Sequence, residues 1–279
     1  MLSTRKLSIP LAIFCSVALA SPLMADINGF GDGSAFTLNG YDQDNTGAII
    51  NTNDPPIISS GILTLTNQTQ AQGRSAFYNT PQNVTAFTAS FIFQDLNQSP
   101  LGAPDGFAFV IQNQGLTAVG GTSAGLGYTV NGAPQPPSGP PITAISSSAA
   151  EEFYLRNGTG ATQFGVNGTG TFDEATSTAP VDLADGDPIQ ITLVYDGTAF
   201  TLSETLTDLS TFDTYSFTRA ADIQDESGPS AYVGFTGATG GAYGDQVISN
   251  FTFISAAPEP ASLSLLALSG VLLLRRRKS

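Results

Sequence analysis

The chain has 279 residues and a formal net charge of −14, with 23 acidic residues, nine basic residues, one cysteine and no histidine or tryptophan. Between the two ends the only cationic residues are Arg74, Arg156 and Arg219, too few to neutralise a row of phosphates or an anionic membrane surface, so binding to either through the main body is excluded. The lack of histidine excludes a Ser-His-Asp triad, a Cys-His pair and imidazole metal ligands.

Residues 1–25 are typical of a secretory signal peptide. Arg5 and Lys6 precede an apolar run over residues 7–20, and small residues after it offer cleavage sites. The alternative is a retained membrane anchor, but this run is shorter than the roughly 20 residues that span a bilayer. Cys15 lies inside the run, so we expect a mature chain without cysteine or disulfides.

Residues 26–256 predict a single all-β domain. Short runs rich in β-branched and aromatic residues recur between clusters of Gly, Pro, Asn and Asp. Alternation with period two places Phe87 and Phe93 on one face of a strand, while the run 107–111 is apolar on both faces and predicts a strand inside a sandwich. No amphipathic helix and no internal repeat stands out. The predicted strands cover residues 62–66, 84–93, 107–111, 189–195, 198–205, 231–235 and 247–254.

Two connections in this domain have a predicted form. Asp196-Gly197 separates two strand-like runs and predicts a hairpin with a two-residue type I′ turn, in which both central residues take positive φ angles. The proline-rich stretch 131–141 predicts a loop without regular pairing, because proline has no backbone N–H for a ladder.

The C-terminus has three parts in order. Pro258-Glu259-Pro260 is followed by a mostly apolar run over 261–274 and then by Arg275-Arg276-Arg277-Lys278. This arrangement resembles the PEP-CTERM sorting signal, and we assign residues 257–279 to it. The resemblance implies processing by an exosortase, transient anchoring in the inner membrane, and a destination on the cell surface or in the extracellular matrix of a Gram-negative-type bacterium. The alternative is a plain tail anchor.

Several stretches of the β-domain resemble an L-type (legume-type) lectin domain in its bacterial version. The resemblance covers residues 27–254 and implies a jelly-roll-like, concanavalin A-like sandwich of two antiparallel sheets, with a sugar site built from loops at one edge. The stretches that carry it are Gly73-Arg74-Ser75-Ala76-Phe77-Tyr78, Pro104-Asp105-Gly106-Phe107-Ala108-Phe109, Ala118-Val119-Gly120-Gly121, Gly125-Leu126-Gly127-Tyr128, Ala231-Tyr232-Val233-Gly234-Phe235 and Asn250-Phe251-Thr252-Phe253.

The resemblance also implies which residues contact the sugar. Asp105 matches the Asp that accepts hydrogen bonds from sugar hydroxyls, as a fixed carboxylate does well. In the family a cis peptide bond precedes this Asp. Gly121, beside Gly120, matches the Gly whose backbone N–H meets the ligand. Further contacts are expected from Asn157 and from backbone groups of Thr239 and Gly240, and Tyr243 or Tyr128 could provide an apolar platform.

The metal site of the family is incomplete in this sequence. Glu152 matches a metal-binding Glu and Asn157 a calcium-binding Asn, but Tyr154 stands where the shared Asp belongs and Gln163 where the His belongs. Because calcium takes six to eight oxygen ligands, we expect Glu152 and Asn157 to be too few for a tight calcium site. We also expect no transition metal and assign no cofactor.

Two functions of different kinds follow. The first is a non-catalytic, exported protein that binds carbohydrate or exopolysaccharide. The second is a structural surface or matrix protein whose lectin-like sandwich has lost its metal and its sugar; Tyr154 filling the metal position would favour it. A degenerate glycosidase is disfavoured, because Glu151 and Glu152 are adjacent on a strand and point to opposite faces.

Overall fold

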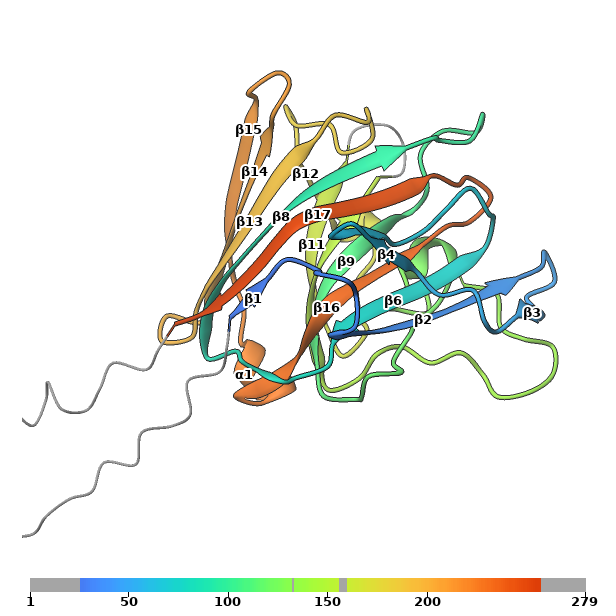
Figure 1. The fold of residues 1–279 in the computed structure, drawn as a ribbon, viewed down its shortest axis with the longest axis horizontal. Helices are drawn as coiled ribbons and strands as arrows, with labels where there is room; N and C mark the ends of the chain where they lie inside the picture. Colours follow the sequence, from blue (N-terminus) through green and yellow to red (C-terminus); the bar gives the residue numbers. More distant parts are fainter. Residues whose placement is uncertain (1–25, 132, 156–159, 257–279) are drawn as a thin grey trace, which may run out of the picture.

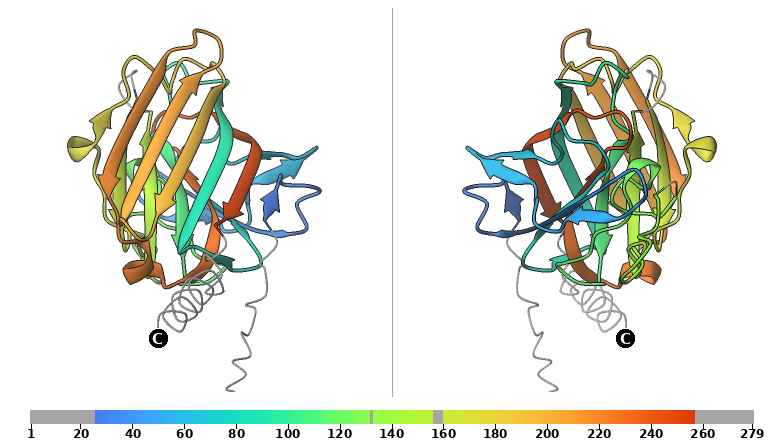
Figure 2. Two further views of the ribbon diagram at one scale, coloured as in Figure 1. Left: turned by 90° about the vertical axis from the view of Figure 1, so that its left-hand side faces the viewer. Right: turned by 90° about the vertical axis from the view of Figure 1, so that its right-hand side faces the viewer.

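The protein is an antiparallel β-sandwich of two sheets, as Figure 1 shows from one side and Figure 2 from two others. The computed structural model describes residues 26–131, 133–155 and 160–256. The predicted signal and sorting segments and Asn157 therefore lie outside the described residues. The all-β, concanavalin A-like fold predicted from the sequence is confirmed.

One sheet has eight strands. In spatial order they are β15 (Thr214–Ala220), β14 (Thr201–Asp208), β13 (Ile189–Asp196), β8 (Ala86–Leu96), β17 (Asp245–Ser255), β5 (Ile62–Thr64) and β4 (Ile57–Ser59), and β1 (Ile27–Asn28) pairs with β17.

The other sheet has nine strands and carries the loops that form the candidate site. In spatial order they are β12 (Thr176–Ser177), β11 (Ala161–Val166), β10 (Ser148–Tyr154), β9 (Gly106–Gln112), β16 (Ser230–Ala238), β6 (Gln72–Tyr78), β2 (Phe36–Gln43) and β3 (Ile49–Asn51), and β7 (Gln82–Asn83) pairs with β16.

Helical structure is minor in the described chain. One α-helix, α1 (Ile223–Ser227), is capped by Asp222, whose carboxylate accepts the N–H of Asp225 at 3.1 Å. Short 3-10 turns occur at Ser123–Gly125 and Phe172–Glu174. None of the helices in the described part of the chain is long and apolar enough to span a membrane.

Stacked phenylalanines fill the space between the sheets. The predicted alternation along β8 is confirmed, since every second residue from Phe87 onward is buried. The ring of Phe107 lies 4.2 Å from that of Phe93 in the facing sheet and 4.6 Å from that of Phe153 on the neighbouring strand, measured between centroids. Aromatic pairs at these separations add to the stability gained from burial alone.

The nine-stranded sheet is also covered on its outer side, which explains the apolar run predicted as an interior strand. All seven residues of β9 are buried. Ala108 and Val110 point away from the sandwich core and pack against Tyr128 and Ile145, which belong to the long connection between β9 and β10. This connection also carries loops of the candidate site.

The β13–β14 hairpin exists, but the predicted two-residue turn is wrong. Asp196 pairs with Thr201, so residues 197–200 form the loop. The Asp196 carboxylate accepts the N–H groups of Thr198 and Ala199, which closes a longer turn, and Phe200 takes the positive φ of 52°. Gly197 is required for a different reason: a Cβ there would lie 1.9 Å from the carbonyl oxygen of Thr85.

Replacing Phe107 tests the aromatic core. Because Phe107 is fully buried between two rings, Phe107→Ala is expected to lower the free energy of unfolding by about 3–5 kcal/mol, measured by urea denaturation of residues 26–256. Thr205→Ala, at an exposed position of β14, is the control and should change it by less than about 0.5 kcal/mol. A similar effect of both substitutions would contradict this account of the core.

Candidate functional site

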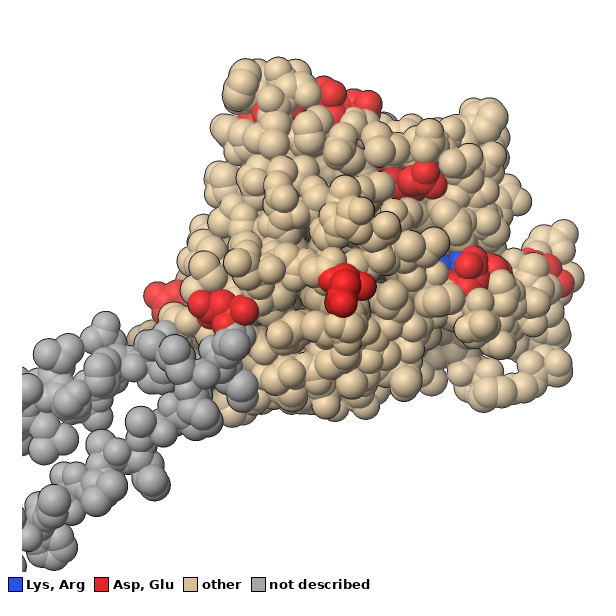
Figure 3. Space-filling model, viewed as in Figure 1, with Lys and Arg blue, Asp and Glu red and all other residues tan. Residues whose placement is uncertain are grey.

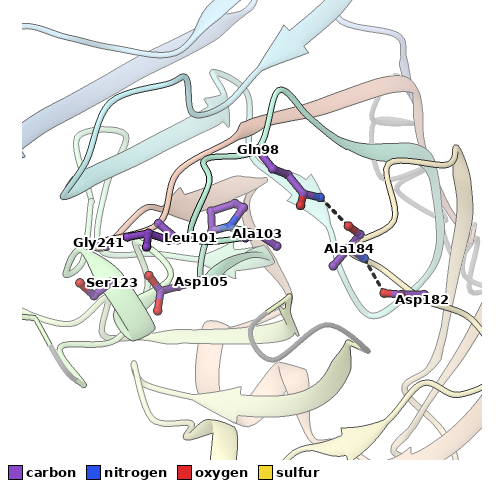
Figure 4. A pocket seen from close by; sticks show the side chains of 12 residues that line it. Gln98, Leu101, Ala103, Asp105, Ser123, Asp182, Ala184 and Gly241 are labelled. Carbon is purple, nitrogen blue, oxygen red and sulfur yellow. Dashed lines mark hydrogen bonds between the residues drawn. The ribbon is translucent and has the colours of Figure 1, made fainter.

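A cavity of about 600 Å³ opens at the end of the sandwich where β8 leads into β9. Its lining comes from four separate parts of the chain: residues 98 and 101–105, Ser123, residues 182 and 184, and residues 240–242. Figure 4 shows Asp105 close to Ser123 and Gly241, with Asp182 and Ala184 on the opposite side. Pockets that bind small ligands typically have volumes of about 300–1,000 Å³.

Asp105 is held at the start of β9 by the residue that follows it. Gly106 has a φ of 141°, and a Cβ there would lie 2.0 Å from the carbonyl oxygen of Phe153, so only glycine fits. The carbonyl of Asp105 accepts the N–H of Leu155 at 3.0 Å. The peptide bond before Asp105 is trans; the cis bond found in the described part of the chain is Ala179–Pro180.

Gly240 lies directly against Asp105, so the structure brings together two of the predicted sugar-binding residues. A Cβ at Gly240 would lie 2.5 Å from Oδ2 of Asp105 and 2.9 Å from Oγ of Ser123. Glycine is therefore needed here for the close approach of the 239–242 loop to the carboxylate.

Gly121 and Thr239 require a correction, because neither lines the cavity and their polar groups are engaged within the protein. Gly240 lines the cavity, but its N–H donates to the carbonyl of Ala242 and its carbonyl accepts the N–H of Ala71. The N–H of Gly121 donates to the carbonyl of Thr129 at 2.7 Å. The hydroxyl of Thr239 donates to the carbonyl of Thr69 and accepts the N–H of Gln72, while its carbonyl accepts the N–H of Ser123. Thr239 thus fixes the loop that carries Gly240, and it also binds Ser123 of the cavity lining.

The two tyrosines considered as platforms have different positions. Tyr128 is fully buried, and its hydroxyl lies 3.0 Å from Oγ of Ser148, so it is a packing residue. Tyr243 instead lines a second cavity beside the first.

Sequence reasoning missed three polar residues of the lining. The side chain of Gln98 donates to the carbonyl of Ala184, and Asp182 accepts the N–H of Ala184 at 2.9 Å. Ser123 starts a 3-10 turn and has a positive φ of 55°. None of them carried a sequence signal beyond that of ordinary turn residues, because they reach the cavity only through the packing of distant loops.

At the expected metal position, Tyr154 and Glu152 contact each other. The Tyr154 hydroxyl donates a hydrogen bond to Oε2 of Glu152, and both side chains are fully buried. Backbone encloses the carboxylate, since a Cβ at Gly170 or Gly165 would lie 2.1 or 2.2 Å from Oε1 of Glu152. Gln163 pairs with Glu152 in register, but its side-chain oxygen accepts the N–H of Thr171 at 2.7 Å.

Comparison with known proteins identifies the family. The sequence matches the legume lectin domain over residues 33–265. The chain belongs to the legume lectin domain family.

Solved structures of plant lectins share the fold of this legume lectin domain. The metal-free form of lectin I-B4 from Griffonia simplicifolia is 18% identical with a TM-score of 0.64, covering 84% of this chain and 100% of that chain. The Bauhinia forficata lectin in complex with GalNAc is 18% identical with a TM-score of 0.63, covering 84% and 99%. Arcelin-5, a lectin-like defense protein from Phaseolus vulgaris, is 17% identical with a TM-score of 0.62, covering 84% and 99%.

The described residues of this legume lectin domain do not fit a calcium ion at Glu152. Calcium requires six to eight oxygen ligands, whereas one carboxylate oxygen here is hydrogen-bonded to Tyr154 and the other is enclosed by glycine backbone. Burial raises the pKa of Glu152 to about 8, with the Tyr154 hydroxyl acting in the opposite direction.

A second buried carboxyl cluster lies between the sheets and was not predicted. Arg219 forms ion pairs with Glu151 at 3.3 Å and with Glu204 at 2.5 Å, and Glu204 also accepts a hydrogen bond from Thr162 at 2.6 Å. Burial raises the pKa of Glu151 well above its usual range, and the charge of Glu204 adds to this, while Arg219 opposes it. Both carboxyl groups are at most 1% exposed, so neither is placed to reach a substrate.

Asp95 and Gln246 form a buried polar pair behind the cavity. They face each other in register on β8 and β17, with exposures of 2% and 0%. None of their side-chain oxygen or nitrogen atoms has a hydrogen-bond partner within the described chain. A Cβ at Gly244 would lie within 3.1 Å of both Oδ1 of Asp95 and Cδ of Pro104. The pair thus supports the cavity's loops from behind.

Burial without a charge partner disfavours the ionised form of Asp95. Burial raises the pKa of Asp95 to about 8, and the charge of Asp245 adds to this, while the Gln98 side chain opposes it. Because the pKa of Asp95 in the folded protein is above the ordinary value of about 4, protonation of this carboxyl group stabilises the folded state in acid. That stabilisation is lost as the pH rises toward 8.

Asp95→Asn tests this dependence, because asparagine has a similar shape and does not titrate. The free energy of unfolding of the wild type should fall more steeply with pH than that of the variant, by up to about 1.4 kcal/mol per pH unit. Urea denaturation between mildly acidic and mildly alkaline pH measures both slopes. Comparing slopes cancels the contributions of Glu151 and Glu152, which titrate in both proteins. Parallel slopes would contradict the assignment.

Proposed function

We propose that this protein is a non-catalytic carbohydrate-binding protein whose ligand enters the cavity beside Asp105. The observation that carries the proposal is that a carboxylate and the backbone of a glycine loop meet in that cavity, with Gly240 directly against Asp105. A positioned carboxylate accepts charge-assisted hydrogen bonds from sugar hydroxyls, and these are stronger than bonds between neutral groups.

The kind of ligand is proposed from the lining and from a related structure. The lining residues in the described chain include Asp105 and Asp182 but no Lys or Arg, which disfavours anionic sugars. GalNAc is the ligand in the Bauhinia forficata lectin complex, which supports a neutral hexose or N-acetylhexosamine here.

A retaining glycosidase mechanism is disfavoured by the placement of the carboxyl groups. Asp105 and Asp182 lie on opposite sides of the cavity (Figure 4), and the paired Glu151 and Glu204 are closed off between the sheets. A retaining glycosidase would need two carboxyl groups about 5 Å apart and accessible to substrate.

The terminal segments supply the proposed location. We propose that residues 1–25 direct export, that 257–279, with Pro258, Glu259 and Pro260, act as the sorting signal read by an exosortase-type enzyme, and that the domain then acts at the surface or in the matrix of a Gram-negative-type bacterium. The carbohydrate partner would be a polysaccharide of that matrix.

A second candidate function is favoured by one specific observation. Tyr154 occupies the expected metal position and is hydrogen-bonded to Glu152. In the structural alternative the sandwich would serve as a stable matrix component that binds no sugar.

Asp105→Asn separates the two candidates. If the carboxylate accepts sugar hydroxyls, the substitution should weaken binding by about 1.5–3 kcal/mol, roughly 10- to 150-fold in Kd, measured by calorimetry with the best ligand from a glycan array. The matched control is Asp225→Asn, at an exposed position of α1 next to the opposite end of β8, and should leave binding unchanged. Equal binding by both variants would refute the assignment of Asp105, and failure of the wild type to bind any glycan would favour the structural candidate.

A further inference from the structure

A second cavity of about 760 Å³ adjoins the first. The two share Ser123, Gly240 and Gly241 as lining residues. The second cavity is otherwise formed by residues of the β2–β3 hairpin, residues 68–71, Pro134 and Tyr243. Each volume lies within the range of about 300–1,000 Å³ that is typical of ligand pockets.

Gly241 forms an open boundary between the two cavities. It is exposed, and a Cβ there would have no heavy atom within 4 Å. Its carbonyl accepts a hydrogen bond from Nε2 of Gln70 at 2.7 Å, which ties the boundary to the 68–71 loop. A ligand can therefore pass over Gly241 from one cavity to the other without meeting a side chain at that position.

The second cavity combines amide groups with apolar surface. Asn45, Gln68 and Gln70 supply amides that both donate and accept hydrogen bonds. Tyr243 and Ile50, the latter 66% exposed, supply apolar surface. Sugar rings offer the same combination, with hydroxyl groups around the edge and C–H groups on the faces.

The charge of the lining residues favours an uncharged ligand. The described lining residues of the two cavities include Asp44, Asp105 and Asp182 and no Lys or Arg. Acidic residues also outnumber basic ones on the face drawn in Figure 3. A chain of uronic acids or sulfated sugars would bring like charges together with no cation to offset them, so an uncharged chain fits best.

We propose that the two cavities form one trough that binds an uncharged oligosaccharide or polysaccharide chain, with one sugar at Asp105 and the following sugars crossing Gly241 to reach Tyr243. The proposal rests on the proposed carbohydrate-binding function and extends it from a single sugar to a chain.

The test measures affinity against chain length. Neutral gluco-, galacto- and manno-oligosaccharides of increasing length, together with the parent monosaccharides, are titrated into residues 26–256 by calorimetry. In at least one series the longer members are expected to bind roughly tenfold more tightly than the monosaccharide, an effect comparable to one aromatic contact. Uronic-acid oligosaccharides of the same lengths should bind more weakly.

Two variants test whether the affinity gained with chain length comes from the second cavity. Tyr243→Ala should remove the gain with length and leave monosaccharide binding intact. Gly241→Leu, which the open space around Gly241 accommodates, should also remove the gain because the side chain stands at the boundary. Phe212→Ala is the matched control, at an aromatic position that is 76% exposed in the β14–β15 hairpin, and should preserve it. Melting temperatures of all the variants confirm folding.

The outcomes separate this inference from the function on which it rests. Monosaccharide binding that Asp105→Asn weakens, with no gain from longer chains or a gain that survives Tyr243→Ala, would overturn the trough and leave the carbohydrate site standing. Tighter binding of anionic chains would also overturn it. If no monosaccharide and no chain binds, both proposals fail together.

Discussion

The hydrogen bond from Tyr154 to Glu152 determines how the candidate site is supported. A carboxyl group buried without a partner is costly, and the Tyr154 hydroxyl supplies that partner from the same face of β10. The Tyr154 hydroxyl satisfies only Oε2 of Glu152, while Oε1 has no hydrogen-bond partner among the described residues and is enclosed by the backbone of Gly165 and Gly170. The support of the neighbouring loops comes from other contacts.

Backbone hydrogen bonds supply that support. Gly121 donates to Thr129, Ser123 donates to Thr239, and Ala71 donates to Gly240. The first bond closes a turn within the β9–β10 connection, the second joins this connection to the loop after β16, and the third joins that loop to the segment before β6. A site held in this way is formed before a ligand arrives, which reduces the entropy lost on binding.

Local patterns in the sequence were enough to predict an all-β sandwich, and the resemblance to L-type lectins supplied its concanavalin A-like form. The alternation along β8 and the apolar run of β9 reflect burial on one face and on both faces, and burial selects residue types directly. Asp105-Gly106 was informative for a similar reason, because only glycine fits at the start of β9. The β13–β14 turn was mispredicted because the Asp196 side chain, and not the positive φ of a glycine, closes it.

The parts that could not be predicted depend on contacts between distant segments. Glu151 meets Glu204 and Arg219 from strands of opposite sheets, and no local pattern records that meeting. The sequence also could not show that the N–H of Gly121 is already bonded, or that Tyr243 faces a second cavity.

The central claim is that a sugar site at Asp105 operates without a metal, because Tyr154 takes the place of a ligand at Glu152. Calorimetric titration of the best-binding glycan, with one sample of the protein in excess calcium and another in excess chelator, tests this claim most directly. The account predicts the same Kd in both samples and the same melting temperature. Binding that disappears in chelator and returns with calcium would contradict it.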